Sequence, residues 1–290
     1  MSSVTLANRG ASAEAIQHHY DAGNDFYRLW LDSTSTYSCA LWEEGDDLDA
    51  AQLRKLDDHA AQARAPGAAH VLDIGCGWGS MLRRLVQVHG VQHAVGLTLA
   101  KNQAQHIQAF GDPRLEVRLE NWSDHVPKQP YDAIISVGAF EHFANHGLTP
   151  EEKIASYRLF FERCHQWLKP GGSISLQTIV YGNCLREDFS PFFAQEIFPE
   201  SDLPRPSEIA AASDRLFELE LLRNHREHYK RTCETWWRRL RQNREEAVRL
   251  VGETVVARYE KYLQYCTIAF HVGTMGLMRV TLRRIDNPRR

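Results

Sequence analysis

A short apolar run followed by three spaced glycines constrains this chain more than any other feature. Residues 69–76 read AHVLDIGC, and Gly75, Gly77 and Gly79 fall within the stretch VLDIGCGWGS. An apolar run of this length, bounded by glycines, is typical of a buried strand. Glycines directly after a strand let the backbone approach a ligand closely and begin a helix. The pattern predicts a strand, a glycine turn and a helix, which form either a ligand site or only a tight turn.

Strand-like and helix-like segments alternate after this unit. Six more strands are expected, at HAVGLTL, RLEVRLE, YDAIISVG, SISLQTI, LFELELL and GLMRVTLRR. One helix is expected from Lys101, and another over EEKIASYRLFFERCHQW, which Pro170 and Gly171 should end. Strands that alternate with helices form parallel sheets with helices on both faces. The chain is therefore predicted to adopt an α/β fold with a doubly wound, mostly parallel seven-stranded sheet.

Two regions do not follow this alternation. The N-terminal region has helical patterns, including one at about 46–65, and is predicted to form a helical lid. Residues 182–212 are rich in prolines and aromatic residues and are predicted to be a cap inserted above the sheet, and two helices are expected at about 228–271. The predicted division is a lid at 1–66 and a core at 67–290.

Composition disfavours several classes of protein. The 290 residues carry a formal net charge of −3, which argues against nucleic acid as a partner. The N-terminus MSSVTLANRGASAEAIQ lacks the long apolar core of a signal peptide, and no apolar run approaches the length of a membrane span. The six cysteines form no Cys-x-x-Cys pair and no zinc spacing. We therefore expect no metal site, no transmembrane segment and a reduced, cytoplasmic location.

The second expected strand argues against a dinucleotide cofactor. It ends in GLTLA, without the acidic residue that dinucleotide sites place there. Asp73 in the first strand, GLTLAKNQ after the second and FEH after the fourth together resemble class I S-adenosylmethionine (SAM) methyltransferases. This resemblance implies a Rossmann-like core that binds SAM.

A narrower resemblance rests on five blocks of sequence. They are HHYDAGNDFYRLWLDSTSTYSCALW, VLDIGCGWGS, GLTLAKNQ, SVGAFEHF and IFPESDLPRPSEI. Their order is similar to that in the cyclopropane fatty acid synthase and mycolic acid cyclopropane synthase family, and some plant alkaloid N-methyltransferases share them. The resemblance extends from about residue 18 to the C-terminus. It implies a SAM-dependent methyltransferase.

The resemblance implies a set of cofactor-binding residues. The resemblance implies that Tyr37 and Ser38 meet the methionine end of SAM. It places Thr98 and Gln103 at the ribose and Trp122 beside the adenine. Considered alone, Thr98 also suits a helix cap, Gln103 a solvated helix position and Trp122 plain core packing. The full expected set is Tyr37, Ser38, Asp73, Gly75, Gly77, Thr98, Gln103 and Trp122.

The resemblance also implies a site that handles a proton. Cys39, Glu141 and Tyr229 match residues that surround a bound bicarbonate in the family, with Cys39 on the acceptor side. Gln177 stands where cyclopropane-forming members usually carry a histidine, and glutamine carries no proton near neutral pH. Either bicarbonate still binds, or Glu141 is itself the base. His142 either assists, as the Glu-His pair does in N-methylating relatives, or makes a structural hydrogen bond.

Two groups of side chains bear on the acceptor. Basic residues outnumber acidic ones between residues 221 and 244, which indicates either a solvated helix face or a surface for a carrier protein, a lipid headgroup or a diphosphate. Aromatic residues in and after the cap suit an apolar or cationic acceptor, or ordinary packing. They are Phe189, Phe192, Phe193, Phe198, Trp236 and Trp237.

The fate of a carbocation separates the candidate reactions. Adding a methyl group to an alkene leaves a cation; loss of a proton from the new methyl closes a cyclopropane, whereas loss from a neighbouring carbon leaves a methylated alkene. Because of Gln177, the favoured function is C-methylation of an olefinic carbon of an apolar metabolite, isoprenoid or lipid. The alternatives are cyclopropane formation on an unsaturated acyl chain, N-methylation of an amine-bearing specialised metabolite, and a SAM-binding protein without catalysis.

Overall fold

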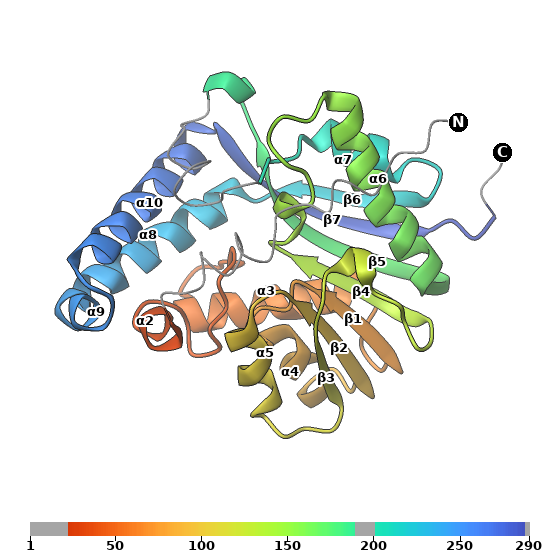
Figure 1. Ribbon diagram of the computed structural model, residues 1–290, viewed down its shortest axis with the longest axis horizontal. Coiled ribbons are helices and arrows are strands. Elements are labelled where there is room, and N and C mark those ends of the chain that lie inside the picture. Colours follow the sequence, from red (N-terminus) through yellow and green to blue (C-terminus); the bar gives the residue numbers. More distant parts are fainter. Residues whose placement is uncertain (1–22, 189–200, 288–290) are drawn as a thin grey trace.

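A seven-stranded sheet forms the centre of the molecule (Figure 1). The computed structural model describes residues 23–188 and 201–287. The strand order is β3-β2-β1-β4-β5-β7-β6. Strands β1 to β5 pair in parallel, and β7 lies antiparallel between β5 and β6, which confirms the predicted fold class. The strands are β1 (His70–Ile74), β2 (His93–Thr98), β3 (Leu115–Leu119), β4 (Tyr131–Val137), β5 (Leu168–Tyr181), β6 (Phe217–Asn224) and β7 (Met275–Arg284).

Helices cover both faces of the parallel part of the sheet. One face packs against α3 (Leu48–Gln62), α4 (Ser80–Gln87) and α5 (Lys101–Gln108), whose apolar side chains share a core with β1, β2 and β4. The other face packs against α6 (Pro150–Trp167) and α7 (Pro206–Ser213). Because β1 is buried from both sides, its sequence after the half-buried His70 is apolar except for Asp73. That exception marks Asp73 as a residue with a role besides packing.

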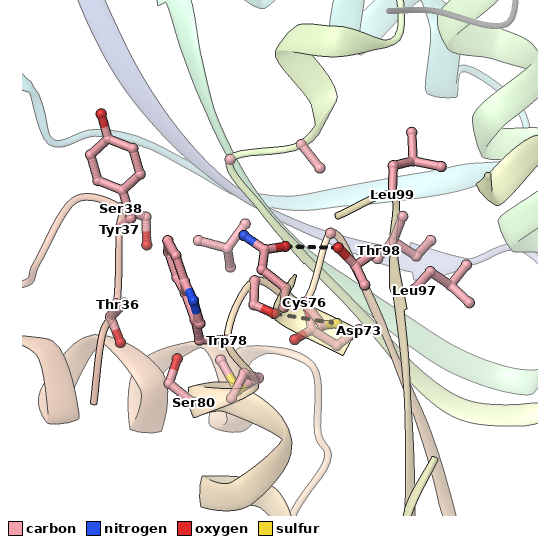
Figure 2. A pocket seen from close by; sticks show the side chains of 18 of the residues that line it. Thr36, Tyr37, Ser38, Asp73, Cys76, Trp78, Ser80, Leu97, Thr98 and Leu99 are labelled. Atoms are coloured by element: carbon pink, nitrogen blue, oxygen red, sulfur yellow. Dashed lines mark hydrogen bonds between the residues drawn. The ribbon is translucent and has the colours of Figure 1, made fainter. Parts of the chain in front are cut away.

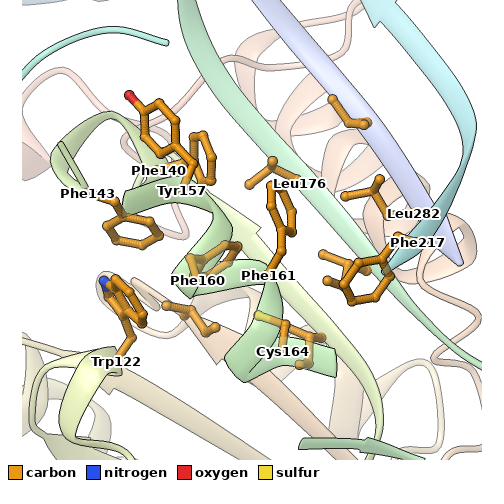
Figure 3. Packing of buried hydrophobic residues seen from close by; sticks show 14 of the residues in the cluster. Trp122, Phe140, Phe143, Tyr157, Phe160, Phe161, Cys164, Leu176, Phe217 and Leu282 are labelled. Atoms are coloured by element: carbon orange, nitrogen blue, oxygen red, sulfur yellow. The ribbon is translucent and has the colours of Figure 1, made fainter. Parts of the chain in front are cut away.

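Local sequence explains why α6 begins where it does. The Thr149 hydroxyl accepts from the Glu152 N–H while the Glu152 carboxylate accepts from the Thr149 N–H, and Pro150 occupies the first helical position. The helix buries a row of aromatic rings, and Figure 3 shows that row facing the end of β4 and strand β5. Phe140 stacks on Tyr157 with ring centroids 4.4 Å apart. This packing fixes the turn after β4, which carries Glu141.

The prediction that Pro170 and Gly171 end α6 was wrong by a few residues. The helix ends at Trp167, and β5 begins at Leu168. The ring of Pro170 disfavours helical backbone at the preceding residue, so the chain is already extended there. Leu168 pairs with Tyr131 and Ser173 with Ala133, so the segment between them bulges out of the ladder. The tight Pro-Gly pair therefore lies within a strand.

A third layer of helices packs at one end of the sheet. It comprises α2 (Asn24–Arg28), α8 (Arg226–Gln242), α9 (Arg244–Val251) and α10 (Glu253–Val272), which share one apolar core (Figure 1). The sequence predicted two helices in the α8–α10 region, but Gly252, with φ +82°, separates a third short helix from α10. The assignment of residues 1–66 to a lid stays a prediction, and residues 1–22 lie outside the described residues.

The assignment of residues 182–212 to a cap stays a prediction. Within residues 182–212, the segment from Pro206 forms α7, which packs its buried Ile209 and Ala212 with α6 against the sheet. Phe189, Phe192, Phe193 and Phe198 lie outside the described residues. No helix of the described residues is long and apolar enough to span a bilayer.

Candidate active site

A cavity opens at the carboxyl ends of β1, β2 and β4, with an empty volume of about 1060 Å³. Open α/β sheets bind ligands at this edge. Figure 2 shows Tyr37 and Trp78 on one side of the cavity and Leu97, Thr98 and Leu99 on the other. Every residue expected to bind the cofactor lines it: Tyr37, Ser38, Asp73, Gly75, Gly77, Thr98, Gln103 and Trp122. Their individual roles in binding stay predictions.

Gly75 and Gly77 in the turn after β1 have different surroundings. Gly75 has φ +82°, and a Cβ placed there would lie 2.5 Å from Cβ of Ala139. Gly77 has φ +53°, and a Cβ there would meet nothing within 4 Å. Gly75 is therefore required by the fold itself, because β1 and the turn after β4 touch at this point. Gly77 leaves open space beside the cavity.

Three side chains that were ambiguous in the sequence acquire definite partners. The Thr98 hydroxyl donates to Oε1 of Gln103 at 2.7 Å (Figure 2) and accepts from the Ala100 N–H just before α5. Gln103 is buried, so the solvated-residue alternative is excluded. Trp122 packs edge-to-face on Phe160 and also lines the cavity, so its position agrees both with core packing and with a place beside the adenine.

Lys55 is a lining residue of this cavity that the sequence analysis missed. It is 1% exposed on α3, lines the cavity, and donates from Nζ to the Ser38 hydroxyl at 2.8 Å. Burial lowers the pKa of Lys55 to about 7, and burial raises the pKa of nearby Asp73 to about 7. A lysine that follows Arg54 on an amphipathic helix gives no sequence signal of burial, so only tertiary structure reveals it.

A second cavity, with an empty volume of about 860 Å³, adjoins the first. Tyr37, Ser38, Gly138 and His142 line both cavities, so a molecule in the second faces a molecule in the first across these residues. The remaining wall is largely apolar and comes from β5, α8, α10, β7 and the segments around Glu141 and Leu203. It includes Ile179, Leu203, Tyr262, Cys266, Met275 and Leu277. We call this second cavity the acceptor cavity.

Glu141 lies in the turn after β4 and lines the acceptor cavity. Its Oε1 accepts from the Ile179 N–H at 2.6 Å, while Oε2 is buried with no hydrogen-bond partner among the described residues. The nearby Thr178 hydroxyl donates instead to the Ile179 carbonyl. Burial raises the pKa of Glu141 to about 7, against the lowering effect of the Ile179 N–H. A carboxyl group with one free oxygen and such a pKa is suited to exchanging a proton near neutrality.

Three of the other expected catalytic residues line a cavity, whereas Cys39 does not. Tyr229 and Gln177 line the acceptor cavity. His142 lines both cavities, its Nδ1 lies 2.6 Å from Oγ of Ser201, and burial lowers the pKa of His142 to about 4, so the ring is neutral. Both observations agree with a structural hydrogen bond at the strand end. Its catalytic role stays a prediction.

Cys39 is not among the residues that line either cavity, and its expected role beside a bound anion stays a prediction. The thiol is fully buried. Its Sγ donates to the Ala40 carbonyl at 3.2 Å, and burial raises the pKa of the thiol to about 12. The Cys39 and Ala40 carbonyls both accept from Arg279, which pulls this segment against β7. Cys39 therefore remains a protonated thiol.

Two expected features of the acceptor region are mainly structural. Trp236 is fully buried against Trp30 and Tyr37. Several basic side chains of α8 and its start are engaged with the protein: Arg231 lies over the ring of Trp42, and Arg239 donates to the Leu31 carbonyl. Within the described part of the chain, no cluster of acidic, histidine or cysteine side chains is arranged to hold a metal ion.

The fold and the cavity at the ends of β1, β2 and β4 define a class I SAM-dependent methyltransferase. The family model for mycolic acid cyclopropane synthetase matches residues 7–280. The chain therefore belongs to the mycolic acid cyclopropane synthetase family. This confirms the predicted family, the enzyme class of one-carbon transfer and SAM as the cofactor, and it sets aside the alternative of a SAM-binding protein without catalysis.

Individual relatives cover nearly the whole chain. Cyclopropane mycolic acid synthase 3 of Mycobacterium tuberculosis is 36% identical over 93% of this chain and 96% of its own length. MmaA2 of the same species is 37% identical over 93% of this chain and 97% of its own. The solved structure of MmaA2 has a TM-score of 0.85 at 35% identity, covering 95% and 99% of the two chains. CmaA1 complexed with SAH and CTAB has a TM-score of 0.86 at 32% identity, with the same coverage.

Proposed function

We propose that this protein forms a cyclopropane on an unsaturated acyl chain. The observation that carries the proposal is the position of Glu141, at the edge of an apolar cavity that shares four lining residues with the cofactor cavity. Relatives at 34–37% identity are cyclopropane mycolic acid synthases, which supports ring closure over the C-methylation that the sequence analysis favoured. The solved CmaA1 complex contains CTAB, and a long apolar chain suits an apolar cavity.

The residues of the site fit both groups that the family implies. When bound, SAM supplies an electrophilic methyl group and bicarbonate supplies a base. The cofactor cavity offers the Lys55 ammonium and the Ser38 hydroxyl to an anionic end, and the Trp122 ring to an aromatic one. The acceptor cavity offers the free Oε2 of Glu141 as an acceptor and the Tyr229 hydroxyl as a donor.

In the proposed reaction, the Glu141 carboxylate accepts the proton that is lost on ring closure. A C–H bond of the newly added methyl group breaks, its electron pair forms the third ring bond, and the proton passes to Oε2, directly or from an anion held beside it. Burial keeps the Tyr229 pKa well above its usual value, so its hydroxyl remains a donor. Apolar walls exclude water, which would otherwise capture the carbocation.

C-methylation without ring closure is the second candidate. One observation favours it: Gln177 lines the acceptor cavity and carries no titratable proton, where cyclopropane-forming members usually have histidine. Presentation of the acyl chain on a carrier protein or a diphosphate stays a prediction.

Isotope retention distinguishes these reactions. The protein would be incubated with SAM carrying a trideuterated methyl group and with phospholipids, acyl carriers bearing cis-alkenes and amine-bearing metabolites, and the products examined by mass spectrometry. Two deuterium atoms in an added CD₂ unit are expected for ring closure. Three retained on a carbon atom indicate C-methylation, and three retained on a nitrogen atom of a metabolite indicate N-methylation; either result would overturn the proposal.

A further inference from the structure

One face of helix α10 is both apolar and exposed. Tyr265, Ile268 and Val272 are 39%, 56% and 59% exposed, respectively. Their spacing of three and four residues places them in one row along the helix. Isolated exposed apolar residues are common on protein surfaces, whereas a contiguous group of them marks a contact surface for a partner. We call this row the outer face of α10.

The neighbouring helix α8 has an ordinary solvated face. Helices α8 and α10 pack together in the same apolar core. The exposed side chains of α8 are all charged or polar, namely Glu227, Arg231, Arg238, Arg241 and Gln242. The outer face of α10, in the same layer, is instead apolar. Exposure to water alone explains the composition of the α8 face but not that of the α10 face.

Basic side chains continue the row toward the start of α10. Lys261 is exposed one turn before Tyr265, and its Nζ lies 5.4 Å from the centre of that ring. Arg258 lies one turn earlier still. The two acidic residues of the helix pair with Arg244 instead; they are Glu253 and Glu260. The row is therefore basic at one end and apolar at the other, which suits an anionic membrane surface.

Helix α10 also forms part of the acceptor cavity. Tyr262 and Cys266 line this cavity from α10, and Met275 lines it three residues after Val272. Figure 1 shows α10 beside α8 at one edge of the molecule, so its outer face can meet an extended surface. A bilayer on the outer face would thus contact the same helix that forms a wall of the acceptor cavity. This continuity favours a lipid surface over a partner protein.

A further exposed apolar residue lies beside the end of α10. The Asn183 N–H donates to the Gly273 carbonyl at 2.8 Å, and Sγ of Cys184 donates to the Thr274 carbonyl at 3.2 Å. These contacts hold the chain against the residues that directly follow α10. Leu185 comes next in the sequence and is 58% exposed, which adds apolar surface near the end of the helix.

We propose that the outer face of α10 docks this protein on the surface of an anionic phospholipid bilayer. Tyr265, Ile268 and Val272 insert at the boundary of the acyl chains. Lys261 and Arg258 meet the phosphate groups. A helix binds a bilayer in this way when its apolar side chains are buried among the lipids and its basic side chains face anionic headgroups. The docking rests on the proposed function only for its purpose, which is to hold the acceptor cavity beside acyl chains.

Vesicle flotation measures the docking without turnover. Vesicles of diphytanoyl phosphatidylglycerol and diphytanoyl phosphatidylcholine contain no alkene, so binding to them is independent of the proposed reaction. The variant Ile268→Gln/Val272→Gln removes two exposed apolar side chains and should weaken binding by about tenfold or more, with the melting temperature maintained. The matched control is Val88→Gln/Val126→Gln, at two exposed valines outside α10, and it should bind as the unaltered protein does.

The basic part of the row is tested separately. Lys261→Gln should weaken binding to the anionic vesicles by about fivefold. It should leave binding to vesicles of diphytanoyl phosphatidylcholine alone unchanged. Lys101→Gln, at an exposed lysine on α5, is the control and should alter neither affinity. Because ions screen exposed charges, added salt should reduce the difference between Lys261→Gln and its control.

The outcomes separate this proposal from the proposed function. It is overturned if the unaltered protein does not float with the anionic vesicles, or if Ile268→Gln/Val272→Gln binds them as its control does. Sedimentation in lipid-free buffer tests the face as a contact between copies: a dimer that this variant alone dissociates would also overturn the proposal. If the expected differences in vesicle binding appear but no alkene is cyclopropanated, the docking stands and only the proposed function fails.

Discussion

The Lys55 ammonium donates to the Ser38 hydroxyl at 2.8 Å, and both side chains line the cofactor cavity. The contact joins helix α3 to the segment that precedes it in the chain and crosses the carboxyl edge of the sheet. Lys55 is the only lysine or arginine among the described residues of that lining. It therefore offers the natural partner for an anionic group of a bound cofactor.

Removing this charge should weaken cofactor binding. We expect Lys55→Met to raise the Kd for SAM by about tenfold to a hundredfold, since a charge-assisted hydrogen bond contributes about 1.5–3 kcal/mol. Calorimetric titration measures the change. Lys128→Met, at an exposed lysine that pairs with Glu116 on the surface, is the control and should leave the Kd unaltered. Equal affinities for Lys55→Met and the control would remove Lys55 from cofactor binding.

Replacing Glu141 should separate binding from chemistry. Glu141→Gln retains a group that can accept from the Ile179 N–H but loses the proton acceptor at Oε2. We expect kcat to fall by about 10²–10⁴-fold while SAM affinity is retained. A rate of product formation within twofold of the unaltered enzyme would exclude Glu141 as the group that takes the proton.

The same substitution should change how stability depends on pH. Burial raises the pKa of Glu141 from 4.5 to about 7, so the folded protein holds this proton more tightly than the unfolded chain. Its stabilising contribution is complete below pH 4.5 and is lost as pH rises through about 7. Relative to the unaltered protein, Glu141→Gln should therefore gain up to about 3 kcal/mol of unfolding free energy between about pH 5 and pH 8. Urea unfolding at both pH values measures this, and a difference that is constant with pH contradicts it.

The glycine turn offers a test of packing. Gly75→Ala should destabilise the fold by more than the roughly 1–2 kcal/mol that left-handed backbone costs a residue with a Cβ, because its methyl would lie 2.5 Å from that of Ala139. The double variant Gly75→Ala/Ala139→Gly removes the clash and should recover part of the loss. If the changes in unfolding free energy of the two single variants simply add in the double variant, the contact between β1 and the turn after β4 does not contribute to stability.

Filling the acceptor cavity should impair the acceptor and spare the cofactor. Cys266 lies on α10 and lines this cavity alone, so Cys266→Phe should lower kcat/KM for an alkene substrate by about tenfold or more without altering the Kd for SAM. Ala257→Phe, at an exposed position on the same helix, is the control. Unchanged kinetics for Cys266→Phe would place the acceptor elsewhere.

Much of this protein is determined locally in its sequence. The strand pattern predicts all seven strands of the described sheet. The clearest signal is the apolar run of β1, because a strand buried by helices on both faces must be largely apolar. The glycine turn and the blocks around Tyr37, Thr98 and Glu141 predict the edge of the sheet that carries the cavity, since parallel strands all end there. Each of these signals lies within a few residues of chain, so a pattern of residue types suffices to find it.

Only the tertiary structure decides which distant side chains meet inside the site. Lys55 and His59 lie on the buried face of α3, although each directly follows a charged residue in the sequence, and Arg279 reaches Cys39 across 240 positions of the chain. Such contacts depend on how strands and helices pack, which residue spacing along one segment does not encode. The same packing brings Arg279 to Oε1 of Gln177 and to the carbonyls of Cys39 and Ala40, because a buried guanidinium must satisfy its donors with the oxygen atoms around it.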